Sequence, residues 1–406
     1  MGRMSILMVI GFNVLFAVMG FNVSKVATKS YENYTSYYNR SMARHIASSA
    51  ANMAASALTF NPEWRDGFSN VGFSGGRFSA SVTVPGPGML RVFVTSTYNE
   101  VKDTTILILG LSNFSRFAYF SDIEGNIWWI TGDTVWGPFH TQQRINVSGN
   151  PVFIGKASSK NGIHLGTRDS NPIFIGGYQS GVNLNLPRDF NALKELARTG
   201  GRHFNNEDIC LQLNADGTAT YRIGSWTSVP AYTMPIRDLA PNGVLMAENA
   251  NLRLKGRLNG RLTVVATGSS GVAKGNVWID SSVTYNRNPM TDPGSEDMLG
   301  IVCDNDVIIT DNANNNNPAN GVTVHASMLC RSGGFKADEY NRRPVAGTLT
   351  VLGGIQQYQR GPVGTFSGGR IVSGFQKNYR YDERLMFSSP PLYPSTGTYE
   401  VLSWYE

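Results

Sequence analysis

The sequence predicts a mainly β protein with a long N-terminal α-helix, a small antiparallel sheet and then a right-handed parallel β-helix-like ectodomain. Three observations predict this order: an uncharged segment followed by a stretch without helix breakers, a region of alternating apolar residues, and many apolar triplets separated by Gly, Asn and Asp. The 406 residues include 44 Gly and only 16% charged residues, as is typical of many short strands and turns. A net charge of +6 without any Lys/Arg-rich run gives no support to nucleic-acid binding.

Residues 4–24 carry no charged side chain, and a helix of this length, at about 1.5 Å per residue, spans a bilayer core of roughly 30 Å. A cleaved secretory signal is the alternative to a retained anchor. The anchor is favoured because Val18, Met19, Phe21 and Asn22 do not form a small-residue cleavage site. We therefore expect this segment to lie in a membrane or to pack against sister helices.

The helix is expected to continue beyond the apolar segment. Residues 25–60 contain neither Pro nor Gly, and Asn61-Pro62 is the first break. Small residues recur along this stretch and form a face that another backbone can approach closely: Ala43, Ala47, Ala50, Ala51, Ala54, Ala55 and Ala57. Residues 1–60 are thus predicted to be one membrane or assembly helix.

Residues 61–115 are expected to form a small antiparallel sheet. Apolar residues alternate with polar ones along 78–84 and again along 90–94, and Pro85-Gly86-Pro87-Gly88 turns the chain between them. A third apolar run follows at 106–109. A small sheet after a long N-terminal helix is the plan of a pilin.

From residue 117 onward, short apolar triplets recur at spacings near 20 residues, which is typical of the coils of a parallel β-helix. We expect first β-helix coils at 116–187 and the main β-helix at 241–372. An inserted segment at 188–240 separates them. It contains a short helix near 189–198 and a hairpin in which 209–213 pairs with 218–223.

Two features accompany the predicted β-helix. Cys303 and Cys330 lie one coil length apart, so they form either a disulfide between neighbouring coils or two buried thiols. Residues 373–406 are rich in aromatics and Pro, and we expect an irregular C-terminal cap that covers the open end of the β-helix.

Motifs spread over residues 117–390 resemble an uncharacterised family of bacterial envelope proteins. Its members combine a PilX-like, type IV pilin-like N-terminal helix with a parallel β-helix ectodomain. The order of the stretches carries the resemblance: 137–141, 148–153, 259–264, 275–279, 297–302, 353–357, 360–364 and 378–385. The resemblance implies an inner-membrane anchor with the ectodomain in the periplasm or on the cell surface. It also implies self-assembly, or assembly with other pilin-like subunits, through residues 4–60.

Parallel β-helices often cleave polysaccharides with converging carboxylates, so the acidic residues were considered as candidates. They are Asp280, Asp297, Asp304, Asp306, Asp311 and Asp338. The Asp304-Asn305-Asp306 triplet is a candidate for Ca²⁺ binding or catalysis. Asp and Asn also favour coil corners for backbone reasons alone, and this structural interpretation is preferred.

Histidine and tryptophan give two further candidates. No pair of His has metal-ligand spacing, and His140 is the one His worth testing, with a hydrogen-bonding role in a coil turn preferred over catalysis. Trp128, Trp129 and Trp136 can stack on a sugar if exposed, although packing against the preceding sheet is the preferred interpretation. We predict no catalytic, cofactor-binding or metal-binding residue and no cofactor.

The functional hypothesis is a structural, pilin-like or pseudopilin-like envelope protein with an exposed and adhesive ectodomain that contacts a surface glycan. It is not predicted to be an enzyme or to bind nucleic acid. The first alternative is a membrane-anchored β-helix that acts on extracellular polysaccharide as a lyase or hydrolase. A secreted glycan-binding module without an assembly role is the second.

Overall fold

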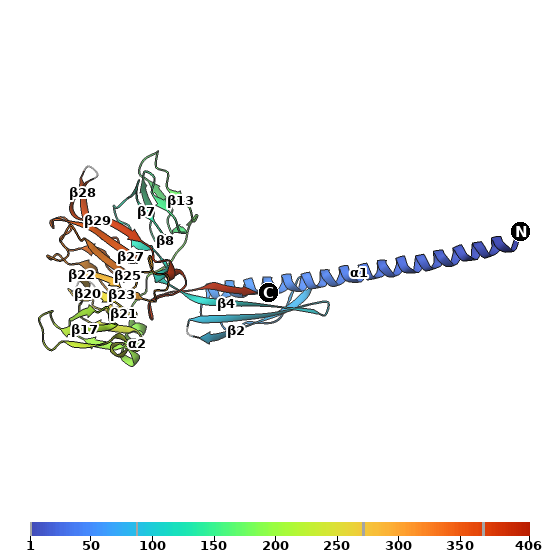
Figure 1. The fold of residues 1–406 in the computed structure, drawn as a ribbon, viewed down its shortest axis with the longest axis horizontal. Helices are drawn as coiled ribbons and strands as arrows, with labels where there is room; N and C mark the ends of the chain where they lie inside the picture. Colours follow the sequence, from blue (N-terminus) through green and yellow to red (C-terminus); the bar gives the residue numbers. More distant parts are fainter. Residues whose placement is uncertain (1, 87, 270–272, 368–369) are drawn as a thin grey trace. The chain divides into compact units, whose positions relative to one another are not determined.

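The computed structural model describes residues 2–86, 88–269, 273–367 and 370–406 (Figure 1). The chain divides into two compact units, of which the first comprises residues 1–112 and 397–406 and the second residues 113–396. Most regular structure is β, and a long helix begins the chain. The prediction of a mainly β protein with a long N-terminal helix is therefore confirmed.

In the first unit, α1 runs without interruption over Gly2–Phe60. Its first part is exposed along its whole circumference, and Phe21 retains 70% of its surface open. The second part buries one face, which consists of Ala43, Ile46, Ala47, Ala50, Ala51, Ala54 and Leu58. The residues of this face recur with a three- and four-residue spacing, as one side of a helix requires.

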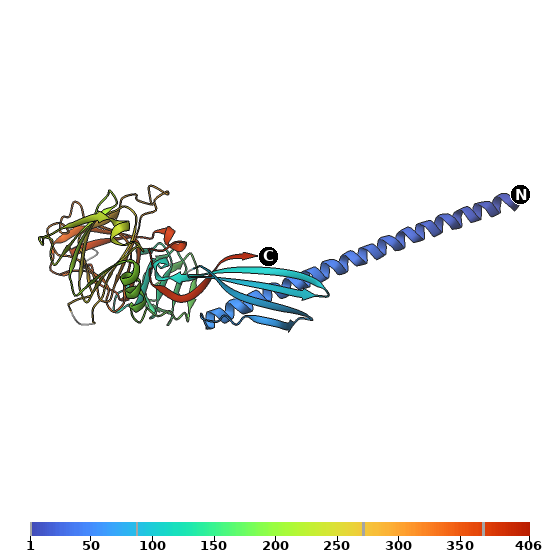
Figure 2. The same ribbon diagram turned by 90° about the horizontal axis from the view of Figure 1, so that it is seen from below.

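The helix packs along a five-stranded sheet in the order β1-β2-β3-β4-β30 (Figures 1 and 2). The strands are β1 (Phe68–Phe73), β2 (Gly76–Gly86), β3 (Met89–Tyr98), β4 (Val101–Asn113) and β30 (Ser395–Tyr405). The antiparallel pairing predicted for the runs around 78–84, 90–94 and 106–109 is confirmed. Pro87 of the predicted turn lies outside the described residues.

Alanines on α1 allow the helix to approach the sheet closely. Val92 and Val94 of β3 are fully buried in the same cluster as Ala50. The hydroxyl of Ser96 donates a hydrogen bond of 2.7 Å to the carbonyl oxygen of Ala43. A larger side chain on this helix face would have no space without moving the sheet.

The second unit contains the remaining strands, joined by short turns. The early strands are β5 (Tyr119–Ile123), β6 (Trp129–Ile130), β7 (Thr134–Val135), β8 (Phe139–Thr141), β9 (Ile145–Ser148), β10 (Val152–Phe153), β11 (Ala157–Ser159), β12 (Ile163–Leu165), β13 (Ile173–Phe174) and β14 (Tyr178–Ser180). The middle elements are α2 (Asn191–Gly200), β15 (Arg202–Asn205), β16 (Ile209–Leu213), β17 (Thr218–Ile223), β18 (Tyr232–Pro235) and α3 (Ile236–Leu239).

The later strands are β19 (Val244–Glu248), β20 (Leu252–Leu258), β21 (Arg261–Ala266), β22 (Val277–Tyr285), β23 (Met298–Cys303), β24 (Val307–Ile309), β25 (Val322–Cys330), β26 (Phe335–Ala337), β27 (Val345–Gln359), β28 (Gly364–Ser367) and β29 (Arg370–Arg380). Among the described residues, two short 3₁₀ turns, Phe114–Arg116 and Glu383–Met386, precede β5 and follow β29. The predicted short helix and hairpin of the inserted segment correspond to α2 and to the antiparallel β16–β17 pair, and both are confirmed.

In the second unit, many strands pair in parallel with the next strand but one along the chain. β19, β21, β23, β25 and β27 form one such series, so that Leu245, Val264, Ile301, Met328 and Ile355 lie opposite one another in a buried column. The sheets are nevertheless mixed, because β16, β17 and β18, as well as β28 and β29, pair antiparallel. The finer prediction of a right-handed parallel β-helix therefore stays a prediction.

The parallel series does not stop at β27. The second half of β27 pairs in parallel with β5, which places Ile355 opposite Tyr119. The series then continues through β8 and β11, where Phe139 and Ala157 extend the buried column. The early strands of the second unit therefore stack onto β27, the longest of the described strands.

The residues predicted to be an irregular C-terminal cap form regular strands instead. The first half of β27 pairs with β29, which lies in this region. β30 joins the sheet of the first unit beside β4, and its Tyr399 and Trp404 pack against the core of that unit. The cap prediction is wrong for these segments because their backbone groups complete two sheet edges, which pair more N–H and C=O groups than an irregular cap.

Replacing Ala50 by Leu should destabilise the first unit by about 1–3 kcal/mol, because three extra heavy atoms must enter a closely packed helix–sheet contact. Hydrogen exchange of β3 amides, measured on the full chain in detergent, should then become faster. Ala27→Leu is the matched control, since Ala27 lies on an exposed part of the same helix. Unchanged exchange in Ala50→Leu would contradict the packing described here.

Candidate functional site

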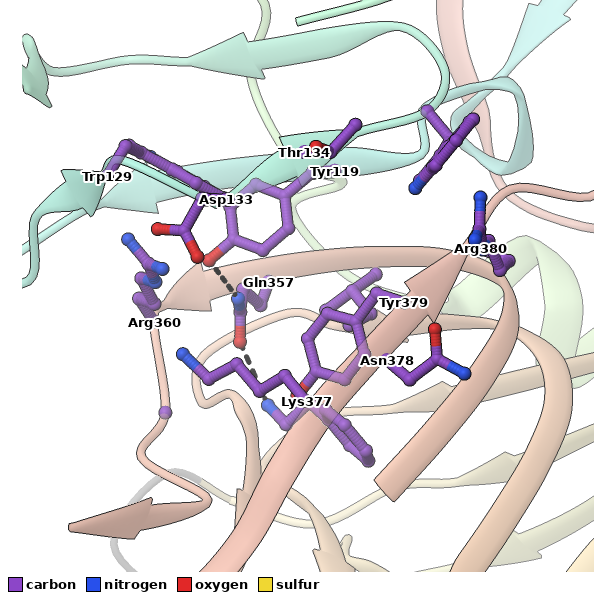
Figure 3. Close-up of a pocket in the computed structure, with 15 residues that line it drawn as sticks. Tyr119, Trp129, Asp133, Thr134, Gln357, Arg360, Lys377, Asn378, Tyr379 and Arg380 are labelled. Carbon is purple, nitrogen blue, oxygen red and sulfur yellow. Dashed lines mark hydrogen bonds between the residues drawn. The ribbon is translucent and has the colours of Figure 1, made fainter. Parts of the chain in front are cut away.

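A cavity of the second unit lies where the two partners of β27 separate (Figure 3). β29 pairs with Val345–Leu352 of this strand, and β5 pairs with its continuation from Ile355 onward. The cavity has a volume of about 260 Å³ and is lined by side chains from β5, β6, β7, β27 and β29. The local fold thus opens a pocket beside β27, between β29 and β5.

Gly353 marks the point at which β27 changes its neighbours. Its φ of 146° and the closeness of the Ala326 carbonyl oxygen, only 1.9 Å from where a Cβ would stand, leave no room for a side chain. The strand can therefore pass tightly across β25 at this position while its two ends pair with different strands.

A buried polar network supports one wall of the pocket. Glu124 is fully buried, and one of its oxygens lies 3.3 Å from a guanidinium nitrogen of Arg360. The indole nitrogen of Trp129 donates to the same carboxylate at 3.2 Å, and the hydroxyl of Ser121 also donates to it. Arg360 in turn lies over the Trp129 ring at 4.1 Å from the centroid. These contacts fix the orientation of Trp129 and Arg360.

Gln357 holds a second wall in place. Its amide nitrogen donates to the hydroxyl of Tyr119 at 2.8 Å, and its amide oxygen accepts from the backbone N–H of Phe335 at 2.9 Å (Figure 3). Burial raises the pKa of the Tyr119 hydroxyl far above its ordinary value, so it remains a neutral hydrogen-bonding group.

The end of β29 brings positive charge to the opposite side of the cavity. Lys377 is exposed, and partial desolvation, followed by the charge of Arg360, lowers its pKa. Water at the exposed side chain weakens this lowering. The guanidinium of Arg380 lies 3.7 Å from the centroid of the Trp136 ring. Asp133 provides the one carboxylate among the described lining residues.

The acidic residues considered from the sequence have separate structural partners. Arg331 pairs with Asp304 at 2.6 Å and Lys336 pairs with Asp306 at 2.6 Å. Asp280 binds Arg253 and also accepts hydrogen bonds from Trp226 and Thr310. The structure therefore does not bring Asp280, Asp304 and Asp306 to one reaction centre.

Two of the remaining acidic residues also have structural contacts. The carboxylate of Asp297 accepts hydrogen bonds from the backbone N–H groups of Gly260 and Arg287, at 2.7 and 2.8 Å. The side-chain amide of Asn316 donates to Asp311 at 2.5 Å. Asp338 and Asp311 both act electrostatically on Arg343. Within the described part of the chain, no group of three or more His, Cys, Asp and Glu is arranged to hold a metal ion.

His140, Trp129 and Trp136 have different environments in the second unit. His140, in β8, is fully buried, and its Nδ1 is 2.8 Å from the hydroxyl oxygen of Ser158. Trp129 is nearly buried and packs against Tyr119, Phe139 and Phe153. Trp136 is 41% exposed and lines the pocket, so it is the tryptophan that a ligand can contact.

Trp128 lies in a separate recess. Its ring centroid is 5.1 Å from that of His164, and Asn126 and Asn146 line the same recess. The Cys303 and Cys330 positions are direct partners in the β23–β25 ladder, and both cysteines are free and buried. Burial, followed by the neighbouring Cys330 thiol, raises the pKa of Cys303 well above its ordinary value.

Several pocket residues were not singled out from the sequence. Arg360 and Asn378–Arg380 lie inside motifs that carry the family resemblance, which was the only signal available for them. Glu124, Asp133 and Lys377 are isolated charged residues in polar stretches. Their convergence depends on the pairing of β27 with both β5 and β29, which no local pattern encodes.

Comparisons with known proteins give a limited result. No family model matches the chain, and no curated protein matches it. Among solved structures, the chain is similar to the competence-associated pilin ComZ from Thermus thermophilus, with 13% sequence identity and a TM-score of 0.40. The match covers 90% of this chain and 97% of that one. A similarity at this level does not establish a shared family.

Glu124→Gln should destabilise the second unit by about 3–5 kcal/mol, because it leaves the buried guanidinium of Arg360 without its counter-charge. Urea unfolding of the full chain, monitored by Trp fluorescence, measures this loss. The double variant Glu124→Gln/Arg360→Met should recover a large part of it. If the single and double variants lose equal stability, the two residues are not coupled.

Below about pH 6.5, His140 should make stability depend on pH. Burial lowers its pKa from 6.5 to about 4, although a hydrogen bond with Gln142 opposes the change. Between these two values the unfolded chain binds more protons, so stability is fully present above pH 6.5 and is lost as pH falls toward 4, by up to about 3 kcal/mol.

The measurement is urea unfolding at several pH values, in wild type and in His140→Gln. The loss should be shallower in the variant but not absent, since burial lowers the pKa of His325 to about 4 as well. Identical slopes in the two proteins would show that His140 does not titrate in this way.

Proposed function

We propose that this chain is a pilin-like envelope protein whose N-terminal helix lies in a membrane or in the core of a filament. The observation that carries the proposal is the division of α1 into two parts. Its first part is exposed, uncharged between residues 4 and 24, and long and apolar enough to cross a membrane. Its second part is fixed to a sheet by buried alanines.

The division of α1 supports assembly more strongly than a simple tether. A tether needs only the spanning segment, whereas here the same rigid helix continues directly into the packed core of the first unit. Exposed Tyr31, Tyr34 and Tyr37 follow the apolar segment and offer contact area to neighbouring helices. The partners we propose are further copies of this chain or other pilin-like subunits.

We further propose that the second unit is a right-handed parallel β-helix in an ectodomain exposed in the periplasm or on the cell surface, where it has an adhesive role. The buried column from Leu245 to Ala157 supports stacked coils. A pocket with aromatic and charged walls supports ligand binding rather than a purely mechanical role.

An enzyme acting on extracellular polysaccharide is the alternative. Such an enzyme needs two carboxylates near one bond, about 5 to 10 Å apart. Asp280, Asp304 and Asp306 are instead held by Arg253, Arg331 and Lys336. Loss of glycan cleavage in Asp304→Asn or Asp306→Asn would support the alternative and contradict the non-enzymatic proposal.

Leu15→Lys should shift the full chain from the membrane fraction toward the soluble fraction. A lysine near the centre of a spanning helix costs about 3 kcal/mol. Fractionation of cells followed by carbonate extraction measures the shift. Tyr34→Lys is the control, since Tyr34 is 67% exposed but lies outside the apolar segment. Equal membrane retention of both variants would contradict the proposed location of the helix.

Deletion of residues 4–24 tests assembly itself and leaves in place the part of α1 that packs on the sheet. Electron microscopy of cells expressing the intact chain should show fibres or an ordered surface assembly, and the deletion should abolish them. If fibres and localisation are the same in both strains, the pilin-like proposal is wrong.

A further inference from the structure

The pocket between β5 and β29 has an excess of positive charge. Arg360, Lys377 and Arg380 line it, against the single carboxylate of Asp133 among the described lining residues. Arg360 is neutralised by Glu124, which lies behind it. The net charge presented to a ligand therefore comes mainly from Lys377 and Arg380.

Lys377 is exposed and has no ion-pair partner within the described parts of the chain. The charges that act on it are Arg360, which is repulsive, and Asp133 and Glu124, which are attractive. In Figure 3 its amine extends toward the side of the pocket on which Arg360 lies. An ammonium group held in this way is available to bind an incoming anion.

Aromatic side chains form the other walls. Tyr119 and Tyr379 line the interior, while Trp136 lies nearer the solvent with Arg380 stacked on its ring. Aromatic faces bind the apolar faces of sugar rings, and the hydroxyl, amide and guanidinium groups around them can bind the ring hydroxyls. Asn378 adds an amide at the same edge.

The size of the cavity limits the ligand. A volume of about 260 Å³ is just below the ~300–1,000 Å³ of pockets for drug-sized ligands. One sugar residue fits this space better than a longer chain, and further residues of a polysaccharide can extend through the open mouth.

We infer that this pocket binds a hexuronic acid residue of an extracellular polysaccharide. Lys377 binds the carboxylate, Arg380 and Asn378 bind hydroxyl groups, and Tyr379 and Trp136 pack against the ring. A phosphate dianion fits less well, because Asp133 reduces the positive potential and Arg360 is already paired. The inference rests on the proposed adhesive role and gives it a substrate class and a site.

Binding should weaken in alkaline solution. The carboxylate of the sugar is ionised at all relevant pH values, so affinity depends on the protonation of Lys377, whose pKa is lowered in the free protein. Affinity should be constant in neutral and acidic solution and fall as pH rises, at a lower pH than the ordinary lysine pKa of 10.5 would give. Tyr119 and Tyr379 do not interfere, because burial raises both of their pKa values beyond this range.

The test is isothermal titration of the full chain in detergent with sodium glucuronate, a uronic-acid oligosaccharide and, for comparison, glucose. Glucuronate should bind and glucose should bind at least about tenfold more weakly, as expected for loss of one charge-assisted hydrogen bond. A free-monosaccharide site should show equal affinity for glucuronate and the oligosaccharide, whereas a polysaccharide site should bind the oligosaccharide more tightly.

Lys377→Met should reduce glucuronate affinity by at least about tenfold and remove the loss of affinity in alkaline solution. Lys377→Arg should retain binding and extend it to higher pH, which also controls for any folding defect of the Met variant. Lys156→Met is the matched control, since Lys156 is exposed in the same unit and does not line the pocket. Equal affinity for glucuronate and glucose, or unchanged binding in Lys377→Met, would overturn the inference.

The outcomes separate this inference from the proposed function. If wild type binds a neutral glycan array but not glucuronate, the adhesive role stands and the uronic-acid site is wrong. If glucuronate binds as expected but deletion of residues 4–24 leaves localisation and fibres unchanged, the site stands and the pilin-like proposal is wrong.

Discussion

The architecture of the second unit depends on the parallel pairing of β27 with β5. Without this pairing, the second half of β27 and the whole of β5 would each present an unpaired edge, and the buried column would end at Ile355. With it, the column continues through Tyr119, Phe139 and Ala157. Segments from opposite ends of the unit thereby share one core.

The chemistry of the interior changes at β27 itself. Before β27, one row of buried positions in the ladder is occupied by Cys303 and Cys330, whose thiols are buried among apolar side chains. From β27 onward, the equivalent positions are Gln357, Ser121 and Thr141. A polar interior must satisfy its hydrogen bonds, and the Glu124–Arg360 pair with its neighbours does so. The pocket lies at this boundary, where polar groups, aromatic rings and water can meet.

Local patterns were sufficient to predict much of the fold. The absence of Pro and Gly over residues 25–60 gave the helix, and alternation along 78–84 and 90–94 gave the sheet. The triplets from 252 to 352 marked strands correctly. The pairing of Ile355 with Tyr119 was not predictable, because apolar triplets specify a buried strand but not its neighbour, and Tyr119 is 238 positions from Gln357, which binds it.

Some residues of the candidate site were likewise predictable from the sequence, and others were not. Trp129 and Trp136 were noticed because tryptophans are rare and large, and Trp136 does line the pocket. Lys377 and Glu124 were missed, since an isolated charge in a polar stretch is usually a solvated surface group. The C-terminal segment was assigned to a cap because its aromatics are irregularly spaced. Tyr399 and Trp404 nevertheless serve the core of the first unit, through a strand whose partner lies early in the chain.

The position of β30 has a consequence for the order of folding. β4 ends at Asn113, and its neighbour β30 begins only at Ser395, so the sheet of the first unit needs a strand that is synthesised after the second unit. Within the second unit, the N–H of Phe114 donates to the carbonyl oxygen of Pro394 at 3.0 Å, which brings the two connections together. Until the second unit has folded, β4 remains an open strand edge. A chain whose second unit is incomplete therefore exposes the edge of β4. Such an edge can pair with a strand of another chain and aggregate, or a chaperone can bind it.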